Sequence, residues 1–507
     1  MPPGQDRAVV SRRSVLGGAV AGLAILGLQA CSSDQPTNTL ATSTPAGRAA
    51  AFAELDAKIE TAMRAYRIPG VAVGVLTDGE EYIKGYGVTN VDRPVPVDGD
   101  TLFRIGSTTK TFTGTAMMRL VDEGRVELDA PVRRYLPDFA VADADAGAIV
   151  TVRQLLDHTS GWLGDFVQDF GRGDDAIARY VAAMTRLPQL TPPGAVFAYN
   201  NAGLVVAGRI IEVVTGATYE TAVQNLLLDP LALTDTRFFS DQIIGLNVAA
   251  SHDVVGEKAV VDTGFWHFPR SCNPTGSLIS TARDQLRYAR FHLGDGTGLM
   301  SEQALIAMRS VPGPGGTLQV ELTGMGVAWM LRPSAENETI VQHGGTWSGQ
   351  RSGFFLVPTR DFAMTVLTNS EGGGHLLSEL FADDWSLRTF AGLSNLPATP
   401  RRLGAAELAP YEGRYVADLI TETGAWDHAV IDFRGDDGRL IGTTADSPDA
   451  STPPGQPPAS GLAFYKPDYG LDLDADLEPV GTRSDFVRGA DGGVAWFRSH
   501  GRLYRRQ

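Results

Sequence analysis

A serine and a lysine three residues apart, in the stretch FRIGSTTKTF (103–112), are the first residues whose types and spacing allow chemistry. Ser107 supplies a hydroxyl that can act as a nucleophile, and Lys110 supplies an amine that can accept its proton once burial has removed the lysine charge. A chain with five lysines contains such a pair by chance in about a quarter to a third of cases. The same residues also fit an N-cap serine beside a solvated lysine, so the motif alone leaves both interpretations open.

The residues after Ser107 predict the element that positions it. Phe112, Ala116 and Leu120 repeat at helical spacing, and Gly124 is a typical helix end, so we expect a helix near 107–123. The serine would then lie at the helix N-terminus, where unpaired backbone N–H groups and the helix dipole favour an oxyanion. Lys110 would follow one turn later on nearly the same face.

Two later stretches carry further reactive side chains in a fixed order. FAYNNAGLVVAGR (197–209) contains Tyr199 and Asn201, which taken alone fit a wall residue and a helix cap. VQHGGTWSG (341–349) contains His343 and Gly345 at the end of a strand-like run. Together with Ser-x-x-Lys, these stretches resemble the serine β-lactamase and penicillin-binding-protein superfamily, whose motifs are S-x-x-K, S-D-N and K-T-G.

The resemblance is strongest to the branch with class C β-lactamases, D-alanyl-D-alanine carboxypeptidases and related esterases, in which Tyr-x-Asn replaces Ser-Asp-Asn. LLDHTSGW (155–162) and PTGSLISTARDQLRYARF (274–291) look like two other segments of that branch. The resemblance covers about residues 50–390. Its four ordered segments make coincidence a poor explanation.

The resemblance implies a role for each matching residue. Ser107 would be the acylated nucleophile and Lys110 its basic neighbour. Tyr199 would carry the proton to the leaving group and help to activate the deacylating water, which requires a phenol pKa lowered from about 10 toward neutrality. Asn201 would hold the amide of the acyl side chain and orient Lys110.

The third motif departs from the superfamily pattern. The oxyanion would sit between the backbone N–H groups of Ser107 and Thr346, next to Gly345. Lactamases usually carry a lysine where this chain has His343, and histidine is charged only below a pKa near 6.5. We therefore expect carboxylate binding that improves as the pH falls toward 6, or that is supplied by Arg351, for which a solvated turn position is the alternative. This departure favours a carboxypeptidase, an aminopeptidase or an esterase over a potent β-lactamase.

The composition and motifs of the chain exclude several other classes of protein. A formal charge of -16 repels polyanions, so no nucleic acid partner is expected. Two cysteines without CxxC spacing and eight scattered histidines predict no metal site, and no cofactor is expected. The α/β-hydrolase motif Gly-x-Ser-x-Gly does not occur in the sequence. The expected partner is a small-molecule or peptide substrate, with cell-wall peptides as one candidate; the oligomeric state stays open.

The N-terminus predicts export. Paired arginines in SRRSVL (11–16) precede an apolar run, which is typical of a twin-arginine signal. LQAC (28–31) resembles a bacterial lipobox, so we expect an export signal over 1–31, a lipid on Cys31 and a disordered tether over 32–48. The protein would then be an envelope lipoprotein held on the membrane by that lipid, the alternative being an ordinary Sec signal with a coincidental cysteine.

The rest of the chain predicts an α+β fold. An amphipathic helix at 49–66, a hairpin around Asp78-Gly79 and a second hairpin at 353–369 frame a mixed region with helices near 151–157, 202–214 and 281–293. We expect a β-lactamase-like domain over 49–392, with an antiparallel sheet flanked by helices and a helical region. A linker (393–404) would lead to a small all-β, lipocalin-like domain (405–507), which either packs over the active-site mouth or acts as a spacer.

These observations predict an exported serine hydrolase that works through a Ser107 acyl-enzyme on an amide or ester, such as a D-Ala peptide, a β-lactam or a small ester. The alternative is a catalytically silent cell-surface binding lipoprotein that keeps a penicillin-recognising fold. The retained reactive side chains in all three motifs favour the enzyme.

Overall fold

The computed structural model describes residue 42 and residues 44–264, 266–294, 296, 298–310, 313–445, 459–474 and 476–507. The expected export signal, its Cys31 and most of the expected tether lie outside the described residues. The first described helix, α1 (Pro45–Ala65), begins earlier than the residue 49 predicted from apolar spacing. It does so because the Thr44 side chain accepts a hydrogen bond from the Gly47 backbone, and Pro45 suits the first turn.

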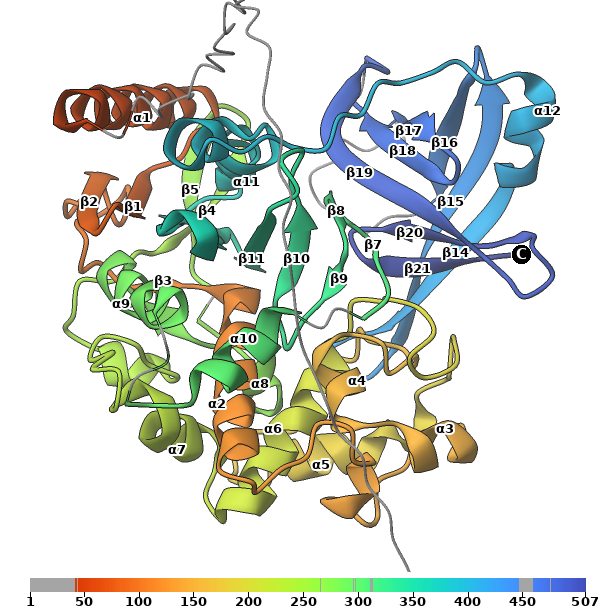
Figure 1. Ribbon diagram of the computed structural model, residues 1–507, viewed down its shortest axis with the longest axis horizontal. Coiled ribbons are helices and arrows are strands. Elements are labelled where there is room, and N and C mark those ends of the chain that lie inside the picture. Colours follow the sequence, from red (N-terminus) through yellow and green to blue (C-terminus); the bar gives the residue numbers. More distant parts are fainter. Residues whose placement is uncertain are drawn as a thin grey trace, which may run out of the picture. The chain divides into compact units, whose positions relative to one another are not determined.

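An antiparallel sheet of seven strands forms the centre of the larger domain, in the order β2-β1-β13-β12-β11-β10-β9 (Figure 1). Its strands are β1 (Gly70–Thr77), β2 (Glu80–Gly87), β9 (Gly324–Met325), β10 (Met330–Pro333), β11 (Thr339–Trp347), β12 (Gln350–Val357) and β13 (Phe362–Thr368). Short antiparallel pairs lie outside it: β3 (Phe103–Arg104) with β6 (Ile279–Ser280), β4 (Ser251–Val255) with β5 (Lys258–Asp262), and β7 (Gly316–Leu318) with β8 (Val320–Leu322). Both predicted hairpins are present, as β1-β2 and β12-β13.

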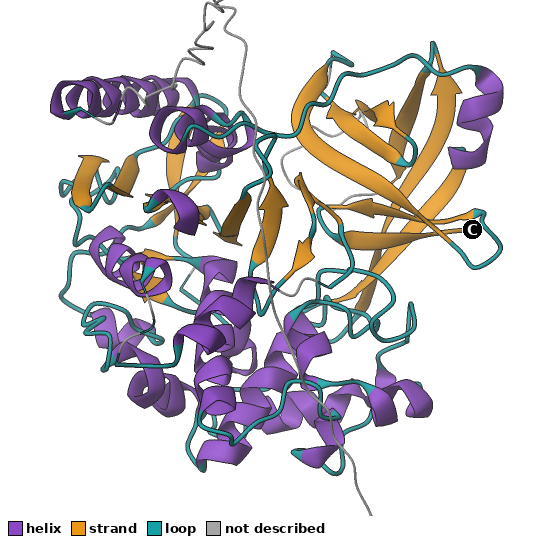
Figure 2. Cartoon of the chain, in the orientation of Figure 1, coloured by secondary structure: helices purple, strands orange, loops and turns teal. Residues whose placement is uncertain are grey.

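Helices cover the sheet and build a separate helical region, shown in purple in Figure 2. Besides α1, the larger domain contains α2 (Thr109–Asp122), α3 (Ala144–Ile149), α4 (Val152–Leu156), α5 (Ala176–Ala183), α6 (Asn201–Thr215), α7 (Tyr219–Val223), α8 (Asn273–Gly276), α9 (Ala282–Leu293), α10 (Glu302–Ser310) and α11 (Gly373–Leu377). The helices predicted near 107–123, 151–157, 202–214 and 281–293 correspond to α2, α4, α6 and α9. Across the described parts of the chain, no single helix has the length and apolar composition to cross a membrane; α6 and Tyr219–Leu228 would meet that test only as a pair bent by 75°.

Both faces of the central sheet are buried. Along β1, Val71, Val73 and Val75 belong to one apolar cluster, while Ala72 and Leu76 belong to another, as the two-residue period of a strand requires. The first cluster includes residues of α1 and α11, and the second includes residues of α2 and α9. The sheet is therefore held between two helical layers, one of which contains α2, and α2 carries Lys110 directly after the turn that carries Ser107.

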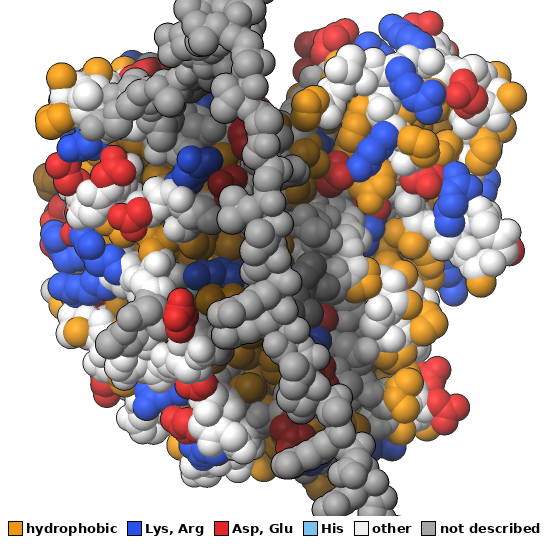
Figure 3. Space-filling model, viewed as in Figure 1, with side chains coloured by type: hydrophobic (Ala, Val, Ile, Leu, Met, Phe, Trp, Pro, Cys, Tyr) orange, Lys and Arg blue, Asp and Glu red, His pale blue; other side chains and the backbone are white. Residues whose placement is uncertain are grey.

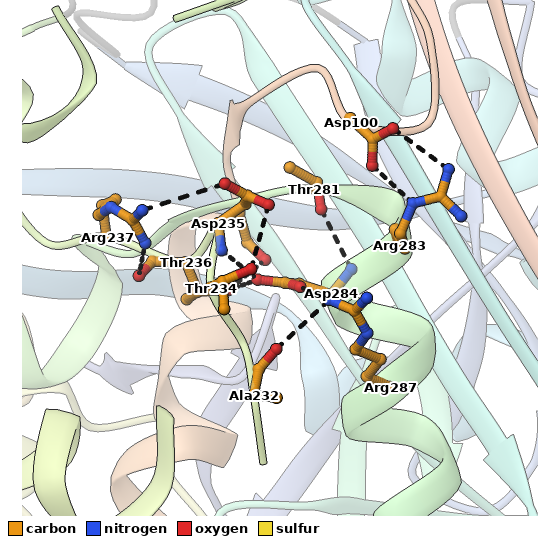
Figure 4. Close-up of polar contacts among 11 residues, drawn as sticks. Asp100, Ala232, Thr234, Asp235, Thr236, Arg237, Thr281, Arg283, Asp284 and Arg287 are labelled. Atoms are coloured by element: carbon orange, nitrogen blue, oxygen red, sulfur yellow. Dashed lines mark hydrogen bonds and ion pairs between the residues drawn. The ribbon is translucent and has the colours of Figure 1, made fainter. Parts of the chain in front are cut away.

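Polar contacts fix the start of α9 against the loop before β4 (Figure 4). Thr281 caps the helix by accepting a hydrogen bond from the Asp284 backbone at 3.1 Å. The Asp284 carboxylate then accepts from the Asp235 backbone at 2.8 Å and from the Thr236 hydroxyl at 3.0 Å. This buried carboxylate explains the Ser-Thr-Ala-x-Asp pattern of the sequence as a structural anchor for the helix that covers the sheet.

A closed antiparallel barrel follows the larger domain. Its strands are β14 (Gly413–Ile420), β15 (Trp426–Asp436), β16 (Arg439–Ala445), β17 (Ala459–Lys466), β18 (Tyr469–Leu473), β19 (Pro479–Arg488), β20 (Val494–Ser499) and β21 (Arg502–Arg506), preceded by the short helix α12 (Ala405–Leu408). Pairing of β14 with β21 closes the barrel. Its core is packed with aromatic side chains: Tyr411, Tyr415, Phe433, Phe464, Phe486 and Phe497. The expected all-β C-terminal domain is thus present, with a filled core.

The surface carries charges of both signs. On the face viewed in Figure 3, the described acidic and basic side chains lie intermingled on the larger domain and on the barrel. The net charge of -16 is the small difference between 59 acidic and 43 basic residues. Many of these charges pair at the surface, where each exposed pair contributes about 1 kcal/mol or less to stability.

Candidate active site

Ser107 lies in a single 3₁₀ turn, Gly106–Thr108, that leads directly into α2. Its side chain is half-buried, whereas Thr108, Thr109 and Lys110 are fully buried. Gly106 has a φ of +48°, and a Cβ there would lie 2.6 Å from the Thr346 backbone nitrogen. Only glycine fits this turn, which presents the serine hydroxyl at the helix N-terminus as the sequence predicts.

Lys110 faces the serine from inside the protein. Its Nζ lies 2.9 Å from Ser107 Oγ and donates to the Thr275 carbonyl at 2.8 Å. Burial lowers the pKa of Lys110 well below its usual range, and the nearby Arg502 charge lowers it further. A buried amine with a lowered pKa, at hydrogen-bond distance from the hydroxyl, is the arrangement that favours general-base activation of a serine.

Tyr199 lies beside this pair, but its ionisation differs from our expectation. Lys110 Nζ is 5.0 Å from the centre of the Tyr199 ring, and the His158 ring stacks on that ring at 4.6 Å. Burial raises the pKa of Tyr199 to about 12, which outweighs the opposing effects of its hydrogen bond with Ser107 and of Arg502. The expected lowering toward neutrality is wrong for the resting site, so Tyr199 is present as a protonated phenol.

His343 is placed by β11 at the same site, and it is uncharged. Burial, with a contribution from Lys110, lowers the pKa of His343 to about 3. Its Nδ1 is 2.6 Å from the Gly344 carbonyl, while the buried Nε2 has no hydrogen-bond partner among the described residues. The expectation of a His343 charge that develops between pH 8 and pH 6 is therefore wrong. The alternative cation, Arg351, forms an ion pair with Glu371.

The end of β11 lies close to the Ser107 turn. A Cβ on Gly345 would lie 1.9 Å from the Ile105 carbonyl oxygen and 2.8 Å from the Ser107 backbone nitrogen. Ser352 of β12 reinforces this junction by donating to the same Ile105 oxygen at 2.7 Å. The Gly345-Thr346 backbone thus lies against the Gly106-Ser107 turn, which is the proximity that an oxyanion site between the N–H groups of Ser107 and Thr346 needs.

Asn201 makes a contact that the sequence did not suggest. The N-cap of α6 is Asn200, whose side chain accepts from the Gly203 backbone, so Asn201 is free of capping. The Asn201 amide donates to Asp165 at 2.9 Å, and Asp165 pairs with Arg502 at 2.9 Å. No bond joins Asn201 to Lys110 among the described contacts, so direct orientation of the lysine is absent from this structure.

Two charged residues of the site, Asp165 and Arg502, were not predicted from the sequence. Burial acts to raise the pKa of Asp165, but the Arg502 guanidinium outweighs it and holds that pKa below its usual range. The Arg502 guanidinium also lies 4.9 Å from the centre of the Tyr199 ring. No local motif marks either residue, since Asp165 follows the TSGW segment in a loop and Arg502 opens the last barrel strand.

The barrel reaches the site through its β20-β21 hairpin. Gly501, at the hairpin turn, accepts a hydrogen bond from the Tyr199 backbone at 2.8 Å. A second connection is made where the Asp165 carbonyl accepts from Ile420, and Val167 donates back to the Ile420 carbonyl. Of the two roles left open by the sequence, packing against the active site is the one found.

This arrangement defines a class: an α+β serine hydrolase fold with a serine and a buried lysine at the start of a helix, facing the edge of an antiparallel sheet. The matching family model is Beta-lactamase, over residues 55–385. Because that range exceeds half of the chain, the chain belongs to the Beta-lactamase family.

Individual relatives agree with this assignment. Penicillin-binding protein 4 of Amycolatopsis lactamdurans is 34% identical over 359 residues, which cover 69% of this chain and 93% of that protein. The crystal structure of SurE superposes with a TM-score of 0.71 at 26% identity, covering 91% of this chain and all of SurE. D-amino acid amidase from Ochrobactrum anthropi (TM-score 0.54, 24% identity, 62% of this chain and 92% of the amidase) shares the fold.

Proposed function

We propose that this protein is an exported serine hydrolase that forms an acyl-enzyme on Ser107 from an amide or ester substrate. The observation that carries the proposal is the 2.9 Å approach of a buried Lys110 amine to a half-buried Ser107 hydroxyl. A solvated lysine, the alternative interpretation of the motif, would not be fully buried. Both side chains that the first chemical step requires are therefore in reach of each other.

In the proposed acylation, Lys110 takes the proton of Ser107 as the hydroxyl oxygen attacks the substrate carbonyl. The oxyanion is held by the backbone N–H groups of Ser107 and Thr346. Tyr199, protonated in the resting site, donates its proton to the leaving group as the carbonyl bond to that group breaks, and Lys110 then reprotonates the phenol. Lys110 and Tyr199 are back in their starting protonation states when the acyl-enzyme has formed. In deacylation, water attacks the acyl carbon in place of the leaving group, the acid is released and Ser107 regains its proton.

The relatives narrow the proposed substrate class, and assays can distinguish among its members. One relative is named a penicillin-binding protein, and SurE, at 26% identity, has been solved with D-Leu. These support a substrate with a D-configured residue, of the D-Ala peptide or β-lactam type, with short esters as chemically simpler alternatives. The envelope is the proposed location, in keeping with cell-wall peptides as the source of such residues.

The test is covalent labelling. Wild-type protein treated with a fluorescent penicillin and with a fluorophosphonate should carry an adduct that mass spectrometry places on Ser107, and Ser107→Ala should carry none. Ser310→Ala, which removes an exposed serine at the end of α10, should label like wild type. A folded wild type that neither labels nor hydrolyses p-nitrophenyl butyrate would favour the silent binding protein, and an adduct on another residue would exclude Ser107 as the nucleophile.

A further inference from the structure

The described active site lacks a positive charge for a substrate carboxylate at the position of His343, where the lactamase pattern has the lysine of Lys-Thr-Gly. Lys110 contacts Ser107 and Thr275, and His343 is buried with its Nδ1 bonded to the Gly344 carbonyl. Arg351 is paired with Glu371. A substrate anion would need a cation from elsewhere in the described structure.

Arg502 has the donors for this task. A guanidinium has five N–H groups. In Arg502, Nε donates to Asp165 at 2.9 Å, one Nη donates to the same carboxylate at 3.3 Å, and the other Nη donates to the His500 carbonyl at 3.0 Å. The described contacts therefore use three donors and leave one N–H on each Nη. Two parallel N–H groups on the outer edge of a guanidinium match the two oxygens of a carboxylate.

The position of Arg502 also suits binding of a substrate carboxylate. Its side chain keeps 38% of its surface exposed although it stands 4.9 Å from the centre of the buried Tyr199 ring. The adjacent Gly501 is bonded to the Tyr199 backbone, which fixes the hairpin at this point. Asp165 holds the inner edge of the guanidinium and connects it to Asn201, so the outer edge is presented in one orientation.

We propose that Arg502, carried by the C-terminal barrel, receives a carboxylate of the substrate through its two remaining Nη–H groups. This proposal rests on the proposed serine hydrolase function. The barrel hairpin then supplies the specificity that the lysine of Lys-Thr-Gly supplies in the lactamase pattern. Asp165 is the residue that positions Arg502, and its own charge weakens the attraction for a substrate anion.

The carboxylate can belong to the acyl part or to the leaving group, and two matched substrate pairs distinguish these sources. The first pair is mono-p-nitrophenyl glutarate with p-nitrophenyl butyrate, which share a leaving group and differ in an acyl carboxylate. The second is an N-acylated D-Ala-D-Ala peptide with its C-terminal amide. For each pair, the readout is the ratio of kcat/KM for the charged substrate to that for the neutral one.

Arg502→Gln should lower this ratio about tenfold or more in at least one pair, since a charge-assisted bidentate contact is lost. Arg502→Lys should lower it less, because the charge remains. Arg505→Gln, on the same strand with an exposed side chain, should give the wild-type ratio.

Equal changes for charged and neutral substrates in Arg502→Gln would mean that Arg502 only supports the local structure and would overturn the proposal. If Arg502→Gln does not fold, Arg502→Lys still decides: a fall of the ratio supports the proposal, and equal changes for the charged and neutral substrates of each pair refute it. The Arg502 proposal can also be tested without catalysis, so that its failure is distinguished from failure of the serine hydrolase function. The measurement is calorimetric binding of N-acetyl-D-alanine and of its amide to Ser107→Ala. If Ser107→Ala binds the acid more tightly than the amide, and adding Arg502→Gln to this variant abolishes the difference, the result supports the proposal without catalysis. Equal binding of the acid and the amide refutes it.

Discussion

Replacing Gly345 by alanine tests the geometry of the proposed oxyanion site. The added Cβ would lie 1.9 Å from the Ile105 carbonyl oxygen, 2.7 Å from Ser352 Oγ and 2.8 Å from the Ser107 backbone nitrogen. The first and third of these atoms belong to the backbone of the catalytic turn, so no side-chain rotation can relieve the overlap. Strand β11 and the Ser107 turn must therefore separate.

The size of the effect follows from that separation. A carbon atom does not normally approach an oxygen closer than about 3 Å, so the two backbones must move apart by about 1 Å. A displacement of this size costs on the order of hundredfold in rate, and the loss of one oxyanion donor costs about 10²- to 10³-fold in kcat. We expect kcat to fall by about two orders of magnitude, together with a loss of about 1 to 3 kcal/mol of stability from overpacking.

The assay is steady-state hydrolysis of p-nitrophenyl butyrate, with thermal unfolding measured on the same samples. Gly344→Ala is the matched control, because a Cβ on this neighbouring glycine meets only the Ser352 carbonyl oxygen, at 3.2 Å. That contact requires a movement of a few tenths of an ångström, so Gly344→Ala should keep most of the activity. Wild-type kcat in folded Gly345→Ala, or an equal loss in both variants, would refute the argument.

Two other predictions concern pH and location. Since the pKa of His343 is lowered to about 3, the preference for a carboxylate substrate over its neutral partner should stay constant from pH 8 to pH 6. Protonation of Lys110 as the pH falls would slow the reactions of both substrates alike and leave this preference unchanged. A preference that grows toward pH 6 would show a charged His343. If Cys31 carries a lipid, Cys31→Ala should move the protein from the membrane fraction to the soluble fraction, and unchanged fractionation would remove the lipoprotein hypothesis.

The sequence predicts those features of the site that depend on neighbours in the chain. Ser107 and Lys110 meet because a turn and the first residues of one helix set their spacing, and α2 starts where the glycine, serine and apolar pattern indicate. The two hairpins were predictable for the same reason, since tight turns and alternating apolar residues are local signals.

The sequence does not predict ionisation or long-range pairing. Our expectations for Tyr199 and His343 used their ordinary chemistry, but burial, which depends on the whole fold, moves the pKa of the phenol up and that of the imidazole down. Arg502 lies far from Asp165 along the chain, and its partner is determined by how the barrel packs on the larger domain. Only the folded chain brings these two charges together.

Closure of the barrel by β21 also has a consequence for biosynthesis. A ribosome completes Ser107, Lys110 and Tyr199 long before it reaches Arg502, and the strand that carries Arg502 finds its place only by pairing with β14 and β20. A nascent chain can therefore possess its nucleophile and base while Asp165 still lacks its counter-charge. The order of synthesis makes the barrel hairpin the last part of the site to be assembled, so the Asp165–Arg502 ion pair can form only in a chain whose barrel has begun to close.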